Sequence, residues 1–413
     1  MTGIDVVVIG GGTAGTEIAV RLAEAGKSVT LVEAGLVGGE SPYVACAPMN
    51  SLLASARRGE PWELAVAKRD AVTGGLDDGS RQRALTAAGV SVLRGTARIT
   101  GPGEVTVGSV TLNPEHLVIA TGSEPIAPPI EGLTDVQPWT TAEALSSHDL
   151  PRRLVILGGG PSGCELAQSY AAFGSQVILA EAEERLLPAE PAFAGERLAA
   201  ALRRCGVDIR LGSPATKAER LSSGIAVALA DGSRIEADRV LLATGRRPRL
   251  SGLGLDALGL PADRLTVDAG GRVAEGVWAA GDCTGSGHRH IASYQARVVA
   301  ACIAGEPAAA DYRALPRVVN TTPAVYAVGA TSGRTAGADS PGDAGQLELY
   351  ADPESGILVG AAAIGVDVAD WMAEITVAIR AEVPVAVLAD VVHASPTHGE
   401  MLEAPLRTLA SGS

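Results

Sequence analysis

The stretch VVVIGGGTAGTEIAVRLAEAGKSVTLVEA, residues 6–34, is echoed by LVILGGGPSGCELAQSYAAFGSQVILAEA, residues 154–182. In both stretches an apolar run leads into a G-x-G-x-x-G loop, then into an amphipathic segment and a second apolar run that closes on a glutamate. These patterns predict strand, loop, helix and strand, which is the βαβ unit that binds dinucleotides. The fold class is therefore predicted to be α/β, with two Rossmann-like units.

Each loop glycine has its own predicted task. The first allows a tight turn, the second lets backbone N–H groups approach a pyrophosphate, and the third lets the helix pack against the strand. In this order they are Gly10, Gly12 and Gly15 in the first unit and Gly158, Gly160 and Gly163 in the second. The closing acids, Glu33 and Glu181, are placed to accept a hydrogen bond from a ribose 2′-hydroxyl. A carboxylate at Glu181 would repel the 2′-phosphate of NADPH, so NADH is expected at the second site.

Charge and composition exclude several classes of partner. The formal net charge is −14 and the pI is about 5.0, and no run of Lys or Arg could follow a phosphate backbone, so no nucleic acid is expected. The first predicted strand begins at Ile4, and the apolar runs are too short to span a bilayer. We therefore expect a cytoplasmic protein without membrane insertion. The cysteines lack the spacing of a disulfide framework or a metal site, which favours reduced thiols; they are Cys46, Cys164, Cys205, Cys283 and Cys302.

Three further strand ends carry predicted contacts to a cofactor. LVIATGSEP, residues 117–125, and VLLATGRRP, residues 240–248, are apolar strands that run into Ala-Thr-Gly turns and mark crossings between domains. VWAAGDCTG, residues 277–285, ends in Gly-Asp, where the acid is either a helix N-cap or, as we favour, holds a ribityl hydroxyl of a flavin. The predicted contacts in these segments are Thr121, Gly122, Gly245, Gly281 and Asp282.

The order of these motifs, followed by HASPTHGE at residues 393–400, resembles the pyridine nucleotide–disulfide oxidoreductases, in particular the lipoamide dehydrogenase, glutathione reductase and mercuric reductase branch. The resemblance covers essentially the whole chain. It implies FAD on the first unit, NAD(P)H on the second, and a C-terminal α/β domain that forms a homodimer. The implied bounds are 1–150 with 246–310 for the FAD domain, 151–245 for the NAD(P)H domain and 311–413 for the interface domain.

The redox segment GGESPYVACAPMN, residues 38–50, departs from that family. Where the resemblance implies two cysteines separated by four residues, this chain has Ser41 and Cys46, so the thiol that would attack a disulfide is missing. Asn50 replaces a lysine that would pair with Glu165 beside the flavin. A helix is predicted to follow, from Ser51 to Arg58.

A matching departure lies near the C-terminus. The resemblance implies a histidine base from the partner subunit at the position of Ser395, and a hydroxyl cannot shuttle protons near neutral pH as an imidazole can. Glu400, which would orient that base, is expected to lack its usual partner. His393 and His398 are alternative bases, although the register puts neither at the base position.

Three functions are compatible with this pattern. The first is transfer of a hydride from NADH through FAD to a small acceptor that needs no dithiol, such as a quinone or a dedicated metabolite. The second uses Cys46 as a single redox centre, because Ser-x4-Cys is also typical of single-cysteine disulfide, persulfide and peroxide reductases, and a helix start favours a thiolate. The third is a non-catalytic flavin-binding protein. We rank the first reading highest, with Cys46, Ser41, Glu165, Ser395 and Glu400 as its candidate catalytic positions.

Overall fold

The computed structural model describes residues 4–339 and 345–411. The chain divides into two compact units. Unit 1 comprises Met1–Ser51, Val66–Ile126 and Gly245–Asp311, and unit 2 comprises Leu52–Ala65, Ala127–Thr244 and Tyr312–Ser413. Among the described residues, no helix has the length and apolar character needed to cross a bilayer.

Unit 1 is built on a six-stranded sheet with the strand order β17-β18-β7-β1-β2-β3. Its strands are β1 (Ile4–Ile9), β2 (Val29–Glu33), β3 (Ser91–Arg94), β7 (Pro114–Ile119), β17 (Arg272–Ala274) and β18 (Val277–Ala279). β1 pairs in parallel with both β2 and β7, and only β17 runs antiparallel to its neighbour. The apolar run of β1 is buried from Val6 onward, as a parallel strand covered on both faces requires.

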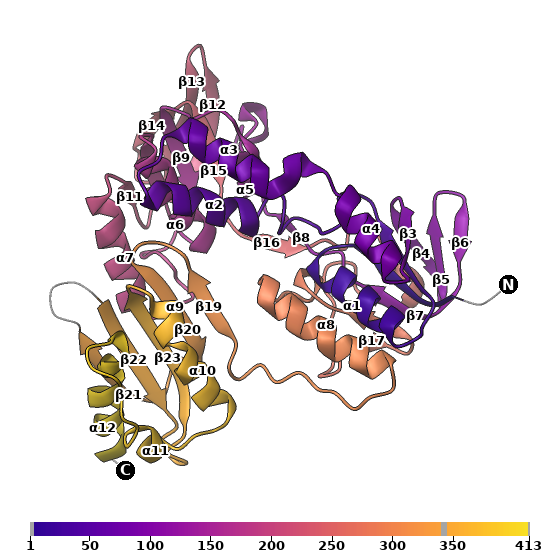
Figure 1. Ribbon diagram of the computed structural model, residues 1–413. Coiled ribbons are helices and arrows are strands. Elements are labelled where there is room, and N and C mark those ends of the chain that lie inside the picture. The colour runs from indigo at the N-terminus through magenta and orange to yellow at the C-terminus, as the bar shows by residue number, and fades with distance from the viewer. Residues whose placement is uncertain (1–3, 340–344, 412–413) are drawn as a thin grey trace. The chain divides into compact units, whose positions relative to one another are not determined.

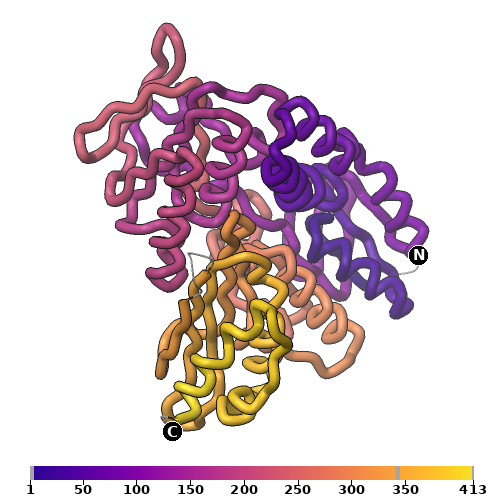
Figure 2. Tube along the Cα trace, turned by 60° about the vertical axis from the view of Figure 1, so that its left-hand side comes forward, coloured from indigo at the N-terminus to yellow at the C-terminus, as the bar shows by residue number. Residues whose placement is uncertain are grey.

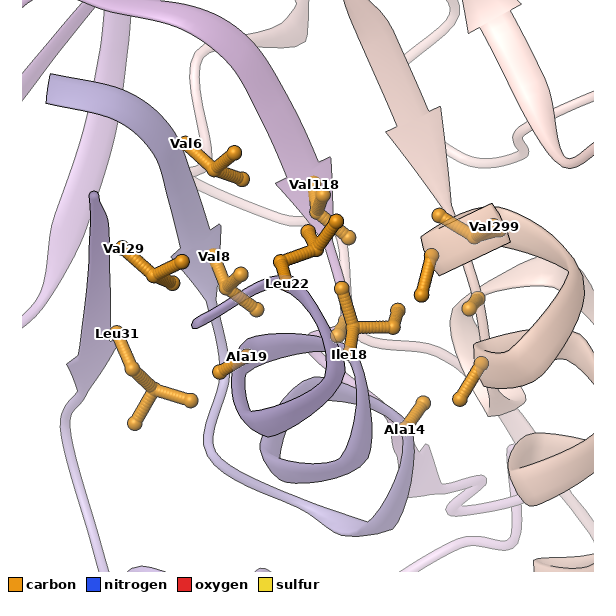
Figure 3. Close-up of a cluster of buried hydrophobic side chains, with 14 of the residues drawn as sticks. Val6, Val8, Ala14, Ile18, Ala19, Leu22, Val29, Leu31, Val118 and Val299 are labelled. Atoms are coloured by element: carbon orange, nitrogen blue, oxygen red, sulfur yellow. The ribbon is translucent and has the colours of Figure 1, made fainter. Parts of the chain in front are cut away.

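One face of this sheet is covered by two helices, α1 (Thr13–Glu24) and α8 (Arg289–Ile303), which lie side by side (Figure 1). Figure 3 shows Val8 of the sheet facing Ile18 and Leu22 of α1, with Val299 of α8 beside them. All four side chains are fully buried, and burial of each stabilises the unit by roughly 1.5–3 kcal/mol. The opposite face packs against a three-stranded sheet of β4 (Ala97–Gly101), β5 (Glu104–Val107) and β6 (Val110–Leu112).

The chain between β2 and β3 contains the redox segment and three α-helices. They are α2 (Cys46–Arg57), α3 (Trp62–Thr73) and α4 (Gly79–Ala87). The helix predicted from Ser51 begins earlier, at Cys46. Pro48 does not prevent this, because a proline in the first turn removes an N–H that has no helical partner.

Unit 2 contains the second βαβ copy. Its parallel sheet has the order β11-β10-β9-β15, made of β9 (Arg153–Leu157), β10 (Gln176–Ala180), β11 (Asp208–Arg210) and β15 (Arg239–Leu242). The helix that follows β9 is α6 (Pro161–Ala172). The remaining elements are α5 (Thr141–Ser146), α7 (Ala192–Arg204), β12 (Ala215–Leu221), β13 (Gly224–Leu229) and β14 (Arg234–Ala237).

The C-terminal part of unit 2, orange to yellow in Figure 2, contains a five-stranded antiparallel sheet with the order β19-β20-β23-β22-β21 (Figure 1). Its strands are β19 (Pro316–Val319), β20 (Ala324–Gly329), β21 (Arg334–Asp339), β22 (Gly345–Ala351) and β23 (Leu358–Gly365). The sequence YADPESGILVGAAAIG has the strand, turn and strand that its pattern predicts. The helices packed on this sheet are α9 (Val368–Trp371), α10 (Ala373–Arg380), α11 (Val385–Leu388) and α12 (Glu403–Ser411).

Candidate active site

The first glycine loop joins β1 to α1 and leaves room for a ligand at one position only. A Cβ on Gly10 would lie 2.3 Å from the carbonyl oxygen of Ala120, and a Cβ on Gly15 would lie 1.9 Å from the carbonyl oxygen of Gly10. Both sites therefore need glycine, and Gly10 also has a φ of +102°. A Cβ on Gly12 would meet nothing closer than the Cα of Gly39 at 3.9 Å. The open space lies where the N–H groups of the loop could meet a pyrophosphate.

Glu33, at the end of β2, folds back onto this loop. Its carboxylate accepts hydrogen bonds from the N–H groups of Gly11 and Gly35, both at 2.5 Å. These charge-assisted bonds hold the side chain at the edge of the loop. Each carboxylate oxygen keeps a lone pair that can accept a hydrogen bond from a ribose hydroxyl.

The turns after β7 and β18 bring further polar groups into unit 1. The hydroxyl of Thr121 is buried and has no hydrogen-bond partner among the described residues, which is costly unless a ligand meets it. The N–H of Gly281, with φ +83°, donates to Gln295 at 2.7 Å. Asp282 accepts a hydrogen bond from the hydroxyl of Ser123 at 2.8 Å. The orphaned hydroxyl and the open space at the loop both fit a bound flavin dinucleotide.

Arg246 lies in the segment VLLATGRRP, whose pattern predicts no role for it, yet it connects three parts of this site. It lies on β16 (Arg246–Pro248), which pairs with β8 (Ser123–Pro125). Its Nε donates to the hydroxyl of Ser123 at 2.8 Å, and its Nη2 contacts Glu40 at 2.6 Å. Because the same Ser123 hydroxyl donates to Asp282, one arginine supports both the flavin-side acid and the segment that leads to Cys46.

Arg246→Met should therefore weaken binding of FAD about fivefold, since charge-assisted hydrogen bonds that orient Asp282 are lost. The measurement is the dissociation constant from fluorescence titration of the apoprotein with FAD. Arg247→Met is the matched control, because the Arg247 side chain is 66% exposed and pairs with Glu124 at the surface. Equal affinities for the two variants would contradict a positioning role for Arg246.

The second glycine loop, in unit 2, repeats the geometry of the first. Gly158 has a φ of +108°, and a Cβ on Gly163 would lie 2.0 Å from its carbonyl oxygen. A Cβ on Gly160 would have no neighbour within 4 Å. Glu181 is buried and accepts hydrogen bonds from the N–H groups of Gly159 at 2.5 Å and Glu183 at 2.9 Å. The two loops are thus built alike.

The other two predicted glycines, Gly122 and Gly245, lie in turns that follow strands. Gly122 has a φ of +72°, and its carbonyl accepts a hydrogen bond from Arg249 at 3.0 Å. Gly245 has a φ of +101°, and its carbonyl accepts one from Ile126 at 3.0 Å. Both belong to the turns of unit 1 that flank β8 and β16.

A cavity of about 670 Å³ in unit 1 brings together the residues of the redox segment. Ser41, Cys46 and Asn50 line it, together with Thr13 at the start of α1. Cys46 is exposed and is the first residue of α2. The positions implied by the family resemblance are therefore adjacent to one another and to the first glycine loop.

All five thiols are free, and they differ in accessibility. Burial raises the pKa of the Cys283 thiol to about 12 and also raises the pKa of Cys164, so both stay protonated near neutral pH. Only Cys46 and Cys205 are exposed. Cys46 is the only cysteine that lines the cavity in the described residues. Within residues 4–339 and 345–411, no group of three or more His, Cys, Asp or Glu side chains could hold a metal ion.

Glu165 lies in unit 2 on α6 and has an amide partner. Its carboxylate accepts hydrogen bonds from the backbone N–H of Asn320 at 2.6 Å and from the Asn320 side-chain amide at 3.1 Å. Burial raises the pKa of Glu165, while these hydrogen bonds and the charge of Arg57 oppose the rise. Arg57 in turn donates to the carbonyl of Asn320 at 2.6 Å. Asn320 and Arg57 gave no motif in the sequence, because they are distant from Glu165 along the chain.

Glu400, which was expected to lack its usual histidine partner, accepts hydrogen bonds from neighbours within its own segment. The hydroxyl of Ser395 donates to the Glu400 carboxylate, and the N–H of Thr397 donates to it at 3.1 Å, and these hydrogen bonds lower the pKa of Glu400. The short helix that begins at His398 needs this cap, so Glu400 closes a capping box there. Ser395 itself is exposed in the subunit.

The two alternative bases differ in their surroundings. The side chain of His393 is only 8% exposed, with Nε2 3.1 Å from Glu374 and Nδ1 3.7 Å from Glu403. This arrangement ties α10 to α12 and favours a structural role. His398 is exposed on the helix that follows Thr397.

Two glycine loops of identical build, each on a parallel sheet and each closed by an acid, define an oxidoreductase of the class that holds two dinucleotides. The chain belongs to the pyridine nucleotide-disulphide oxidoreductases: the family model matches residues 4–301, and the model of the family's dimerisation domain matches residues 323–405. Members of this family are flavin-dependent oxidoreductases that use FAD and NAD(P)H.

Relatives resemble the chain over nearly its whole length. A dihydrolipoyl dehydrogenase of Halobacterium salinarum is 32% identical over 97% of this chain and 94% of its own. A mercuric reductase of Shigella flexneri is 30% identical over 94% of this chain and 77% of its own. The solved structure of the HOCl-induced flavoprotein disulfide reductase RclA from Escherichia coli is 26% identical, with a TM-score of 0.88 over 98% of this chain and 99% of that one.

Proposed function

We propose that this chain passes a hydride from NADH through FAD to a small acceptor that takes electrons directly, without a dithiol. The observation that carries the proposal is the cavity of unit 1, where a hydroxyl, Ser41, stands in the place of a thiol and Cys46 has no second cysteine beside it among the described residues. Dithiol–disulfide exchange needs an attacking and a resolving sulfur. A quinone needs neither, because it gains two electrons and two protons, one proton arriving with the hydride and the other from solvent.

Different residues would bind the two nucleotides. FAD, when bound, supplies the two-electron relay between donor and acceptor. Thr121, Asp282 and Glu33 would hold it at the first loop, and the loop from Gly158 to Gly163 would hold the donor's pyrophosphate. We assign the FAD domain to residues 1–150 and 246–310, the NAD(P)H domain to 151–245 and the interface domain to 311–413.

NADH is the proposed donor because the second loop is closed by an acid, Glu181. Glu181 is fixed by two backbone N–H groups and presents its charge where a 2′-phosphate would lie. The first arginine after it, Arg185, donates to the carbonyl of Pro188 at 2.9 Å. A 2′-phosphate would therefore meet repulsion rather than a partner.

A single-cysteine reductase is the second candidate, and the exposure of Cys46 at the start of α2 favours it. Steady-state turnover separates the two. With NADH as donor and a neutral quinone as acceptor, Cys46→Ser should retain at least about half of the wild-type kcat, and Ser41→Ala should behave alike. Loss of quinone reduction in Cys46→Ser, with coenzyme A disulfide or a persulfide reduced by the wild type, would select the single-cysteine mechanism instead.

We also propose that the C-terminal part forms a homodimer through an apolar surface of exposed valines. Val392 is 92% exposed, Val377 67%, Val387 56% and Val391 45%. Exposed apolar side chains gathered in one part of a chain are typical of interaction surfaces, and the family's dimerisation domain covers these residues.

The double variant Val377→Asp/Val392→Asp should raise the dimer dissociation constant at least about 100-fold, because two carboxylates per subunit would be buried without partners. Sedimentation velocity at several concentrations measures the shift. Val72→Asp/Val110→Asp, at two exposed valines of unit 1, is the matched control and should remain dimeric. A dimer that survives the first double variant would place the interface elsewhere.

A further inference from the structure

The cavity beside Cys46 carries an excess of positive charge in a chain whose net charge is −14. Five charged side chains line it, and they are Glu17, Arg21, Glu24, Arg81 and Arg289. Arg21 pairs with Glu17 at 3.0 Å along α1, so these two charges offset each other. The remaining charges are two arginines and one glutamate.

Arg81 projects from α4 and is held by Tyr43, through ring packing and a side-chain hydrogen bond, rather than by an acid. Its guanidinium carbon lies 5.6 Å from the ring centroid of Tyr43, a cation–π distance, and its stem contacts the Gly38 backbone region. Tyr43 is itself fixed, because it is 3% exposed and its hydroxyl donates to the carbonyl of Val37 at 3.0 Å. Within the part of the chain that the structure describes, Arg81 forms no ion pair with a carboxylate. Its position is thus set while its charge remains available.

Arg289 reaches the cavity from α8, an element distant from α4 in sequence. It is exposed, and across residues 4–339 and 345–411 it likewise has no carboxylate partner. Ser293, on α8 with Arg289, also lines the cavity, and its hydroxyl can donate to an anion. A guanidinium with free N–H groups is the side chain best suited to a carboxylate, a sulfonate or a phosphate.

We propose that the acceptor reduced at this cavity carries an acidic group, which Arg81 and Arg289 bind while the reducible ring lies beside Ser41 and Cys46. The inference rests on the proposed function, since it assigns the class of acceptor to the same site. The chain as a whole is negatively charged and repels anions. Arg81 and Arg289 oppose that repulsion within the cavity, so the cavity favours an acidic acceptor. The redox step is that of any quinone: two electrons and one proton come from NADH, and solvent supplies the second proton.

The test compares two quinones in the Cys46→Ser background, which excludes addition of the thiol to the ring. NADH-dependent reduction of menadione, which is neutral, is measured beside that of 1,4-naphthoquinone-2-sulfonate, which is an anion. Arg81→Gln/Arg289→Gln should lower kcat/KM at least about tenfold for the sulfonate and less than twofold for menadione. Arg81→Lys/Arg289→Lys should retain most of the preference, because the charges remain. Arg83→Gln, on the same helix α4 but outside the cavity lining, should change neither.

A binding measurement keeps this inference separate from the proposed function. Isothermal titration of the FAD-loaded protein with 2-naphthalenesulfonate, which cannot be reduced, should show binding that weakens at least about tenfold in the double Gln variant. Absence of quinone turnover in Cys46→Ser would contradict the proposed function, yet the titration would still decide the anion site. Equal loss for both quinones, or unchanged binding of 2-naphthalenesulfonate, would overturn the assignment of Arg81 and Arg289.

Discussion

Gly163→Val should abolish reduction of the bound flavin by NADH, with a loss of at least about 100-fold in the rate. A Cβ at Gly163 would lie 2.0 Å from the carbonyl oxygen of Gly158 and 3.3 Å from the Cβ of Ala243, so α6 must move away from β9. That movement displaces the helix N-terminus and the N–H groups expected to hold the nucleotide's pyrophosphate, and overpacking of this kind costs roughly 1–3 kcal/mol.

The measurement is stopped-flow reduction of the flavin band by NADH, with dithionite to show that the flavin remains reducible. FAD content and circular dichroism establish that the variant is folded. Ala172→Val, at an exposed position of the same helix, is the matched control and should keep the wild-type rate. Gly160→Ala is a finer probe, because its Cβ would have no protein neighbour within 4 Å. It should leave stability unchanged and weaken NADH binding alone. A folded Gly163→Val protein that is reduced at the normal rate would contradict the proposed donor site.

Glu181→Ala should shift the ratio of kcat/KM for NADH to kcat/KM for NADPH by at least about 100-fold toward NADPH. The carboxylate that would accept from the ribose hydroxyl is lost, and hydrogen bonds to charged groups are worth about 1.5–3 kcal/mol, or about ten- to 150-fold. The repulsion of the 2′-phosphate disappears with it. The N–H groups of Gly159 and Glu183, which now donate to Glu181, become available to the phosphate.

Flavin reduction by each nucleotide, measured over a range of concentrations, gives the ratio. Glu184→Ala removes the same charge from an exposed neighbour and serves as the control for a general electrostatic effect. A ratio that changes equally in Glu181→Ala and Glu184→Ala would mean that Glu181 has no specific contact with the ribose.

The two βαβ units could be predicted from sequence because their determinants are local. The close approach that requires a glycine is made by a residue of the same loop or of the adjacent strand. Gly15 packs against Gly10 in this way, and Gly163 packs against Gly158. The repeat therefore carries the same spacing in both copies, and the hairpin of the C-terminal sheet carries its own turn signal at Asp352, whose carboxylate accepts from Ser355.

The supporting contacts could not be predicted, because they join residues that no motif connects. Arg246 meets Glu40 across 206 positions of sequence, and Asn320 meets Glu165 across 155. The hydroxyl of Ser395, five residues before Glu400, donates a hydrogen bond to its carboxylate. The sequence Thr-x-x-Glu at Thr397 and Glu400 is typical of a capping box, and the structure contains one there.

The most direct test of electron transfer without a dithiol is an anaerobic titration of the flavin with NADH, for the wild type and for Cys46→Ser. One NADH per FAD is expected to complete the reduction in both proteins, with superimposable spectra and no long-wavelength charge-transfer band. Uptake of four electrons per flavin by the wild type, or a charge-transfer band that Cys46→Ser removes, would contradict it and make Cys46 a redox partner of the flavin.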